Sequence, residues 1–224
     1  MIDFQPLILS IELASLTTVI LFFLAVPLAY WISEKDFKLK PVILAVISMP
    51  LVLPPTVLGF YLLVLFSPNN FPGKLIENLF NLRLIFSFEG LVVASIIYSM
   101  PFMVNPIQAG FENLSSSLKE AAYTLGKSKF QTLTKVLLPN IKSSLLTGIV
   151  LSFAHTIGEF GIVLMIGGNI PGKTRVASLA IYDEVESLNY HTANVYALIL
   201  FSVTFSILLI VFIINRKYLK SGKL

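Results

Sequence analysis

Long stretches without an acidic or basic side chain constrain this chain more than any other feature of its sequence. Four stretches contain no Asp, Glu, Lys or Arg: residues 13–33, 41–73, 90–111 and 187–215. A fifth, residues 143–168, contains only Glu159. A helix needs about 20 mostly apolar residues to cross a bilayer, and all five stretches are long enough. Charged residues make up 12% of the chain, about half the share usual in soluble domains. The sequence therefore predicts an all-α integral membrane protein.

The expected spans make residues 1–224 a single multi-pass transmembrane domain. We place them at residues 8–32, 42–66, 89–110, 141–166 and 191–214. Most basic residues outside the spans fall at residues 35–40, 119–142 and 216–223. The connections on the other side hold Lys74, Arg83, Lys173 and Arg175. Because cytoplasmic loops are enriched in Lys and Arg, we expect the N-terminus outside and the C-terminus in the cytoplasm, which agrees with five crossings.

The turn GGNIPGKT, residues 167–174, matches the phosphate-binding loop pattern G-x-x-x-x-G-K-[ST] at every position. The predicted topology places this turn outside the cell, where ATP is not available. Such a loop also follows a buried strand in an α/β domain, whereas this turn follows a predicted span. Pro171 removes an N–H group from a loop that would have to donate N–H groups. We therefore interpret the match as coincidental.

The connection between the third and fourth spans, residues 112–139, predicts two short cytoplasmic helices, and we call it the elbow. Ser117 and Glu120 fit the S-x-x-E capping box that begins a helix, and Gly126 suits a helix end. The pattern S-x-x-Q from Ser128 fits a second capping box. Spacing alone leaves two interpretations open. The elbow either receives another protein or lies at the membrane surface, with its lysines facing anionic lipid.

The second candidate site surrounds Glu159. A charged side chain within a span costs roughly 2.5–3.5 kcal/mol on insertion scales, so an ionisable residue there indicates function. His155 lies four residues earlier, on the same face of an ideal helix, and the nearby glycines permit close contact or local unwinding. We expect a transport path and gate lined by His155, Gly158, Glu159, Phe160 and Gly161. Glu159 would join helices or tune the gate rather than bind an anion. Alternatively, it pairs with His155 or with water near the outer mouth.

The elbow also resembles a known motif. The run EAAYTLG, followed after nine residues by VLLP, is similar to the EAA loop of ABC-importer permeases. The matching positions are Glu120, Ala121, Ala122, Gly126, Leu138 and Pro139, with Val136 in place of Ile. The resemblance implies an elbow that docks in a cleft of a separate ATPase subunit. That subunit would bind ATP and Mg²⁺, and this chain would be non-catalytic, without a cofactor or a metal site of its own.

A second resemblance narrows the family. GEFG at residues 158–161, followed by IPGKT at residues 170–174, is similar to the molybdate branch of these permeases. Sulfate permeases share the GE-[FY]-G element and the EAA loop, and Ile162–Val163 replaces the usual Ala-Thr pair. The resemblance implies import of a tetrahedral oxyanion, molybdate, with tungstate or sulfate as alternatives, by alternating access. It also implies a homodimer with an ATPase pair and an external substrate-binding protein in a prokaryotic inner membrane.

Two other classes of membrane protein are alternatives to an ABC-importer permease. A membrane-embedded enzyme would need converging acid, base or metal groups, and the spans offer mainly His155 and Glu159. A secondary transporter driven by H⁺ or Na⁺ would be expected to show inverted repeats and several polar sites at mid-membrane, and neither is evident in the sequence. We expect no nucleic-acid partner.

Overall fold

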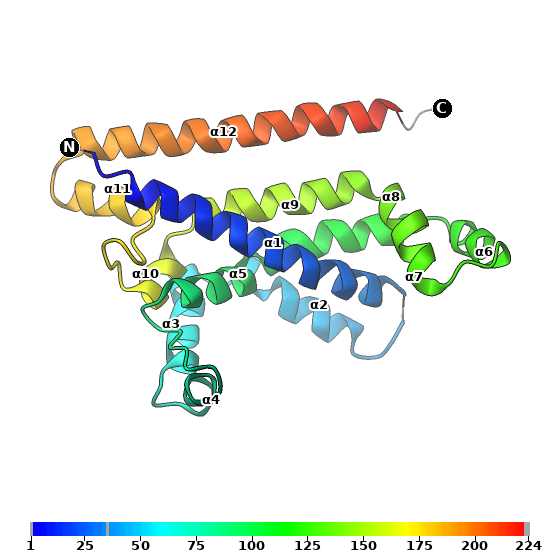
Figure 1. The fold of residues 1–224 in the computed structure, drawn as a ribbon, viewed down its shortest axis with the longest axis horizontal. Helices are drawn as coiled ribbons and strands as arrows, with labels where there is room; N and C mark the ends of the chain where they lie inside the picture. The colour runs from blue at the N-terminus through cyan, green and yellow to red at the C-terminus, as the bar shows by residue number, and fades with distance from the viewer. Residues whose placement is uncertain (1, 35, 222–224) are drawn as a thin grey trace.

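The computed structural model describes residues 2–34 and 36–221, and every regular element in those ranges is helical. Three long helices, α1 (Gln5–Glu34), α5 (Phe88–Glu112) and α12 (Tyr190–Ser221), lie along roughly the same axis as α9 (Lys142–Ile157), which runs in the opposite direction (Figure 1). Three residues used in the charge argument have side chains outside the described part: Arg216, Lys217 and Lys220. Lys35 and Lys223 lie outside it altogether.

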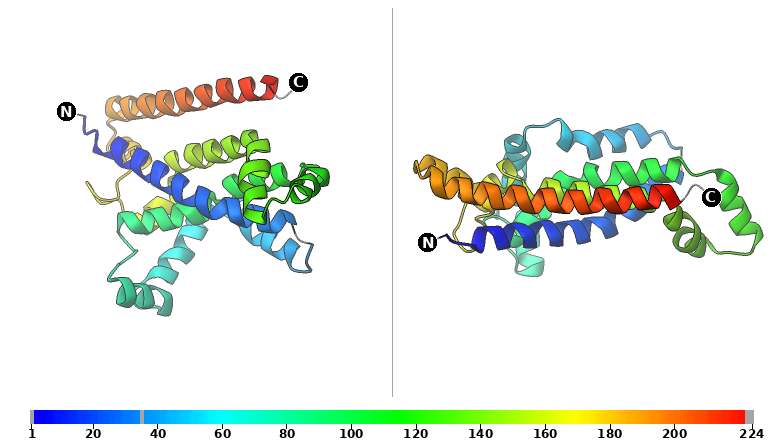
Figure 2. Two further views of the ribbon diagram at one scale, coloured as in Figure 1. Left: turned by 45° about the vertical axis from the view of Figure 1, so that its right-hand side comes forward. Right: turned by 90° about the horizontal axis from the view of Figure 1, so that it is seen from above.

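Shorter elements connect the long helices. They are α2 (Lys40–Ser48), the 3-10 turn η1 (Met49–Leu51), α3 (Pro55–Phe66), α4 (Phe71–Phe80), α6 (Ser116–Thr124), α7 (Lys129–Thr132), the π-helical η2 (Leu133–Leu137), α8 (Leu138–Asn140), α10 (Gly161–Gly167) and α11 (Ala177–Glu186). The elbow helices lie at one end of the bundle, and α11 lies at the other end with the start of α1 (Figures 1 and 2). The two candidate sites are therefore far apart along the bundle.

Two of the expected spans are not continuous helices. Of the helices described, three are long and apolar enough to cross a membrane, and up to five crossings result if each of two bent pairs counts as one. Residues 40–51 and α3 meet at 110°, which breaks the expected span 42–66. Residues 129–140 meet α9 at 76°, at the start of the expected span 141–166, and that span is itself interrupted at residues 158–160, between α9 and α10. Pro54 and Pro55 explain the first bend, because proline lacks the N–H that would continue a helix. Pro54 is extended (ψ 135°), and Pro55 begins α3.

The buried core follows α1 and α5 along the bundle. Near the α11 end, Leu13 of α1 and Leu91 of α5 pack with Ile162 of α10. Near the elbow, Ile32 of α1 packs in a second cluster that includes Leu137 of η2. Helix α1 therefore contributes to the apolar packing at both ends of the molecule.

Candidate functional site

The first helix of the elbow, α6, is capped by a different residue from the one that the sequence predicted. The residue that caps α6 is Ser115, whose Oγ accepts from the Ser117 N–H at 3.3 Å. The expected capping box of Ser117 and Glu120 is therefore wrong. Three consecutive serines offer the same capping chemistry. Because Ser115 has extended backbone and Ser117 is already helical, the first of the three caps the helix.

The hinge between α6 and α7 agrees with the expectation. Gly126 has a φ of +74°, a left-handed conformation that favours glycine. Its N–H donates to the Tyr123 carbonyl at 2.9 Å, and the Lys127 N–H donates to the Ala122 carbonyl at 3.0 Å, which is the Schellman pattern of a helix end. The second capping box is confirmed. The Ser128 N–H donates to Gln131 Oε1 at 3.1 Å, and the Gln131 N–H donates to Ser128 Oγ at 3.2 Å.

The elbow divides its residues between an inner and an outer surface. Ala122 is 3% exposed and packs inward, whereas Glu120, Ala121 and Gly126 are exposed. Leu138 is half-buried and Pro139 is exposed. Two large apolar side chains on either side of the hinge also face outward, Leu125 at 77% and Phe130 at 74% exposure. The elbow therefore presents an apolar surface next to an acidic residue, and that combination suits a protein partner.

The Glu159 region is a break between two helices. Helix α9 ends at Ile157 and α10 begins at Gly161, so residues 158–160 lie outside both helices. Glu159 is only 4% exposed. Its Oε2 accepts from the Ser95 hydroxyl of α5 at 2.6 Å, and its carbonyl accepts from the Ser178 hydroxyl of α11. The other carboxylate oxygen, Oε1, has no hydrogen-bond partner among the described residues. The break therefore joins α5 and α11.

The expected alternative pairing of Glu159 with His155 is not formed. The His155 ring packs instead against Phe102 and Tyr98, with ring centroids 4.1 and 4.6 Å apart. The sequence argument assumed a continuous helix, in which residues four apart share a face. Since α9 ends at Ile157, that spacing no longer places the two side chains together.

A cavity of about 400 Å³ opens beside the break. It is lined by Pro55, Thr56, Tyr98, His155, Gly158, Glu159, Phe160 and Gly161. All five expected gate residues therefore lie around one cavity. The lining contains a carboxylate but no Lys or Arg, so in this conformation the cavity lacks the positive charge that would hold an oxyanion. The lining therefore does not fit an oxyanion-binding site.

The backbone N–H groups at the end of the turn at residues 167–174 donate to a carbonyl of the same turn. The N–H groups of Lys173, Thr174 and Arg175 all donate to the Ile170 carbonyl, at 3.1, 2.9 and 3.0 Å. The Thr174 hydroxyl, which is buried, donates to the Gly167 carbonyl at 2.7 Å. A phosphate-binding loop needs those N–H groups free to meet its ligand. The geometry therefore supports the interpretation that the sequence match is coincidental.

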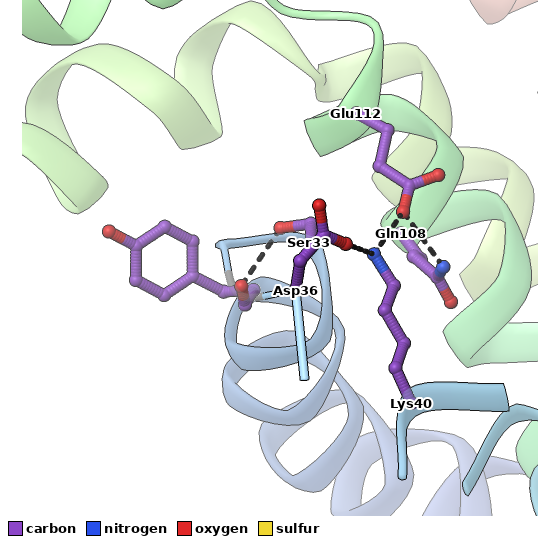
Figure 3. A network of polar contacts seen from close by, with 6 residues as sticks. Ser33, Asp36, Lys40, Gln108 and Glu112 are labelled. Carbon is purple, nitrogen blue, oxygen red and sulfur yellow. Dashed lines mark hydrogen bonds and ion pairs between the residues drawn. The ribbon is translucent and has the colours of Figure 1, made fainter. Parts of the chain in front are cut away.

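A polar network joins the helices at the elbow end (Figure 3). Lys40 Nζ lies 3.3 Å from Glu112 Oε1 and 3.8 Å from Asp36 Oδ1, and Gln108 Nε2 donates to Glu112 Oε1 at 3.0 Å. This network ties the start of α2 to the end of α5. Within the described residues no group of three or more His, Cys, Asp or Glu is placed to hold a metal ion.

Sequence reasoning missed the partners in these contacts. Lys119 forms an ion pair with Glu34, and nothing near either residue in the sequence predicted it. Ser95 and Ser99 were also missed. They are the buried hydroxyls of α5 that meet Glu159 and Thr156. The available signal was the pair of serines four residues apart in an apolar span, which would place both on one helix face.

Solved structures identify the class of fold. The chain superposes with a TM-score of 0.78 on a crystal structure of a bacterial ABC transporter involved in the import of the acidic polysaccharide alginate, at 17% identity over 95% of this chain and 78% of that one. A second alginate ABC transporter structure, in complex with an alginate pentasaccharide-bound periplasmic protein, gives 0.75 at 19% identity over 96% and 78%. The fold is that of an ABC transporter membrane subunit.

Sequence comparison identifies the family. Residues 15–220 match the binding-protein-dependent transport system inner membrane component family, and the chain belongs to it. It is 47% identical over 192 residues to the molybdenum transport system permease protein ModB of Azotobacter vinelandii, covering 86% of this chain and 85% of that one. It is 35% identical to a putative molybdenum permease, YvgM, of Bacillus subtilis (96% and 93% covered). It is 34% identical to the sulfate permease CysT of Salmonella typhimurium (88% and 69% covered). The family resemblance of the elbow and of GEFG is confirmed.

Proposed function

We propose that this chain is the membrane subunit of an ATP-driven importer that carries molybdate into the cell. The observation that carries the proposal is the 47% identity to a molybdenum permease over most of both chains. ATP and Mg²⁺ would bind to a separate ATPase subunit, and an external binding protein would deliver the anion. We prefer this assignment to the alternative of an ion-coupled secondary transporter, because the family is described as binding-protein-dependent.

The elbow is the proposed docking site for the ATPase. Its exposed residues, including Glu120, Leu125 and Phe130, offer an acidic acceptor and an apolar surface beside a fixed hinge. Such a surface is costly to leave in water and suits a protein cleft. The elbow would lie in the cytoplasm, with the N-terminus and the turn at residues 167–174 outside. The lysine distribution supports this orientation.

A homodimer would complete the transport path. Helices α3 and α4 project from the bundle (Figure 1) and expose large apolar side chains, among them Phe60, Tyr61, Phe71 and Phe80. A second copy of the chain is proposed to cover part of this surface, and lipid the rest. The cavity beside Glu159 is proposed as part of the gate, because all five residues that the sequence predicted for the gate line it.

Sulfate is the second candidate cargo, because the sulfate permease CysT is 34% identical over 88% of this chain. Sulfate, molybdate and tungstate are all tetrahedral dianions, so the external binding protein would make the selection. The choice is tested with proteoliposomes that contain this chain and its ATPase, supplied with the binding protein. We expect ATP-dependent accumulation of molybdate that excess tungstate suppresses and excess sulfate suppresses less. Accumulation driven by an ion gradient without ATP would contradict the proposal.

A further inference from the structure

The elbow is tied to the inner end of α1 by a side-chain ion pair. Lys119, the residue before Glu120, pairs with Glu34, the last residue of α1. Both side chains are 26% exposed, so water screens this pair less than a fully exposed one. Ile32 of α1 and Leu137 of η2 belong to one buried apolar cluster in the same region. The end of α1 is therefore joined to the elbow by an ion pair with α6 and by an apolar cluster that includes η2.

The other end of α1 is tied to α11. The N–H of Ala177, the first residue of α11, donates to Ser10 Oγ of α1 at 2.8 Å, and both residues are buried. The first N–H groups of a helix have no partner within it, so Ser10 supplies from another helix what a local cap would supply. Gln5 adds a bond from its Nε2 to the Gly172 carbonyl at 3.4 Å.

Helix α1 spans the distance between these two contacts. Its 30 residues extend about 45 Å at 1.5 Å per residue. Leu13, Leu21, Ala25 and Ile32 are buried along it, so the helix is held against the bundle on both sides of its internal proline, Pro27. The residue after Ala177, Ser178, donates to the Glu159 carbonyl. A continuous set of contacts therefore runs from the elbow through α1 and α11 to the break.

We propose that Lys119 and Glu34 are positioning residues that couple the elbow to the Glu159 break through α1, with Ser10 as the outer anchor. The inference rests on the proposed function, in which a partner ATPase moves the elbow. The inference also assigns a role to the turn at residues 167–174. This turn contacts the outer end of α1 through the hydrogen bond from Gln5 to the Gly172 carbonyl and would help to hold α1 in place.

The test compares Lys119→Ala and Glu34→Ala with the exchanged pair, Glu34→Lys combined with Lys119→Glu, in proteoliposomes with the ATPase and the binding protein. In each single variant we expect an ATP hydrolysis rate within about twofold of the wild-type rate. The number of anions transported per hydrolysed ATP should fall by about threefold or more. The exchanged pair should recover most of that ratio. Lys142→Ala is the matched control, because Lys142 is exposed just beyond the elbow, outside the proposed docking site, and has no ion pair in the described structure. Unchanged coupling in both single variants, or no recovery in the exchanged pair, overturns the proposal.

A second measurement does not depend on transport. Amide hydrogen exchange is followed in the purified chain in lipid nanodiscs. Lys119→Ala should speed exchange in the first turn of α11, including the Ala177 N–H, by threefold or more, and Lys142→Ala should not. Exchange that changes only within α6 overturns the proposal. The two experiments can fail separately. If the wild-type complex transports no oxyanion, the proposed function is contradicted. The exchange measurement still tests whether α1 connects the elbow to α11.

Discussion

At the scale of single residues, Glu159 is a buried carboxyl whose side chain has one hydrogen-bond partner among the described residues, Ser95. Glu159→Ala leaves the fully buried Ser95 hydroxyl without its acceptor. We expect that variant to lose about 1–3 kcal/mol of unfolding free energy. Glu159→Gln keeps an acceptor oxygen and the side-chain shape, so it should lose clearly less. Denaturation in detergent, followed by circular dichroism, checks both values. Equal losses in the two variants would show that the Ser95 bond does not stabilise the break.

Residue-level contacts were the part of the site least accessible from sequence. The presence of Glu159 in an apolar stretch predicted an important position, because charge in a span is costly. The partner could not be predicted, since Ser95 lies 64 residues away. The same holds for Lys119 with Glu34, at 85 residues, and for Ala177 with Ser10, at 167. Local chemistry identifies which residue needs a partner, and only the packing of helices determines which residue supplies it.

At the scale of elements, the hinge of the elbow depends on one backbone conformation. Gly126 has a φ of +74°, and a Cβ added there would meet no atom within 4 Å. Gly126→Ala therefore causes no clash, and its cost is the left-handed backbone itself, roughly 1–2 kcal/mol. We expect this variant to insert normally and to move fewer anions per ATP, because the angle between α6 and α7 is no longer fixed.

Gly126→Asn is the matched control for the hinge, because asparagine adopts the left-handed conformation more readily than alanine. It should retain more coupling than Gly126→Ala when both are measured as the ratio of transported anion to hydrolysed ATP. The opposite order would mean that the hinge conformation does not set the coupling.

The junction between α3 and α10 gives a paired test on two glycines of the break. A Cβ at Gly161 would lie 2.9 Å from the Pro55 Cβ, whereas a Cβ at Gly158 would have the Ala154 carbonyl oxygen as its nearest neighbour, at 3.8 Å. Gly161→Ala should therefore destabilise the protein by about 1–3 kcal/mol through overpacking, and Gly158→Ala should be tolerated. Thermal unfolding in detergent compares them. Equal melting temperatures would contradict the close approach of the two helices.

The elements themselves were largely predictable, and their continuity was not. Apolar stretches and capping signals are local, so the sequence indicated the long helices α1, α5 and α12 and the two helices of the elbow. Pro54 and Pro55 interrupt the helix between residues 40–51 and α3, but the angle of 110° depends on how neighbouring helices pack around them.

At the scale of the whole molecule, the elbow and the turn at residues 167–174 lie at opposite ends of the bundle (Figure 1). Labelling at either end therefore tests the orientation of the whole chain in the membrane. The chain contains no cysteine. A thiol reagent would therefore label only a cysteine introduced by mutation. Lys173 and Leu125 are both exposed, which makes Lys173→Cys and Leu125→Cys a matched pair. In intact cells a membrane-impermeant maleimide should label Lys173→Cys and leave Leu125→Cys unlabelled. Permeabilised cells should show both labelled unless the ATPase covers Leu125. Labelling of Leu125→Cys in intact cells would place the elbow outside, where no ATPase could reach it, and would refute the coupling proposals together with the orientation.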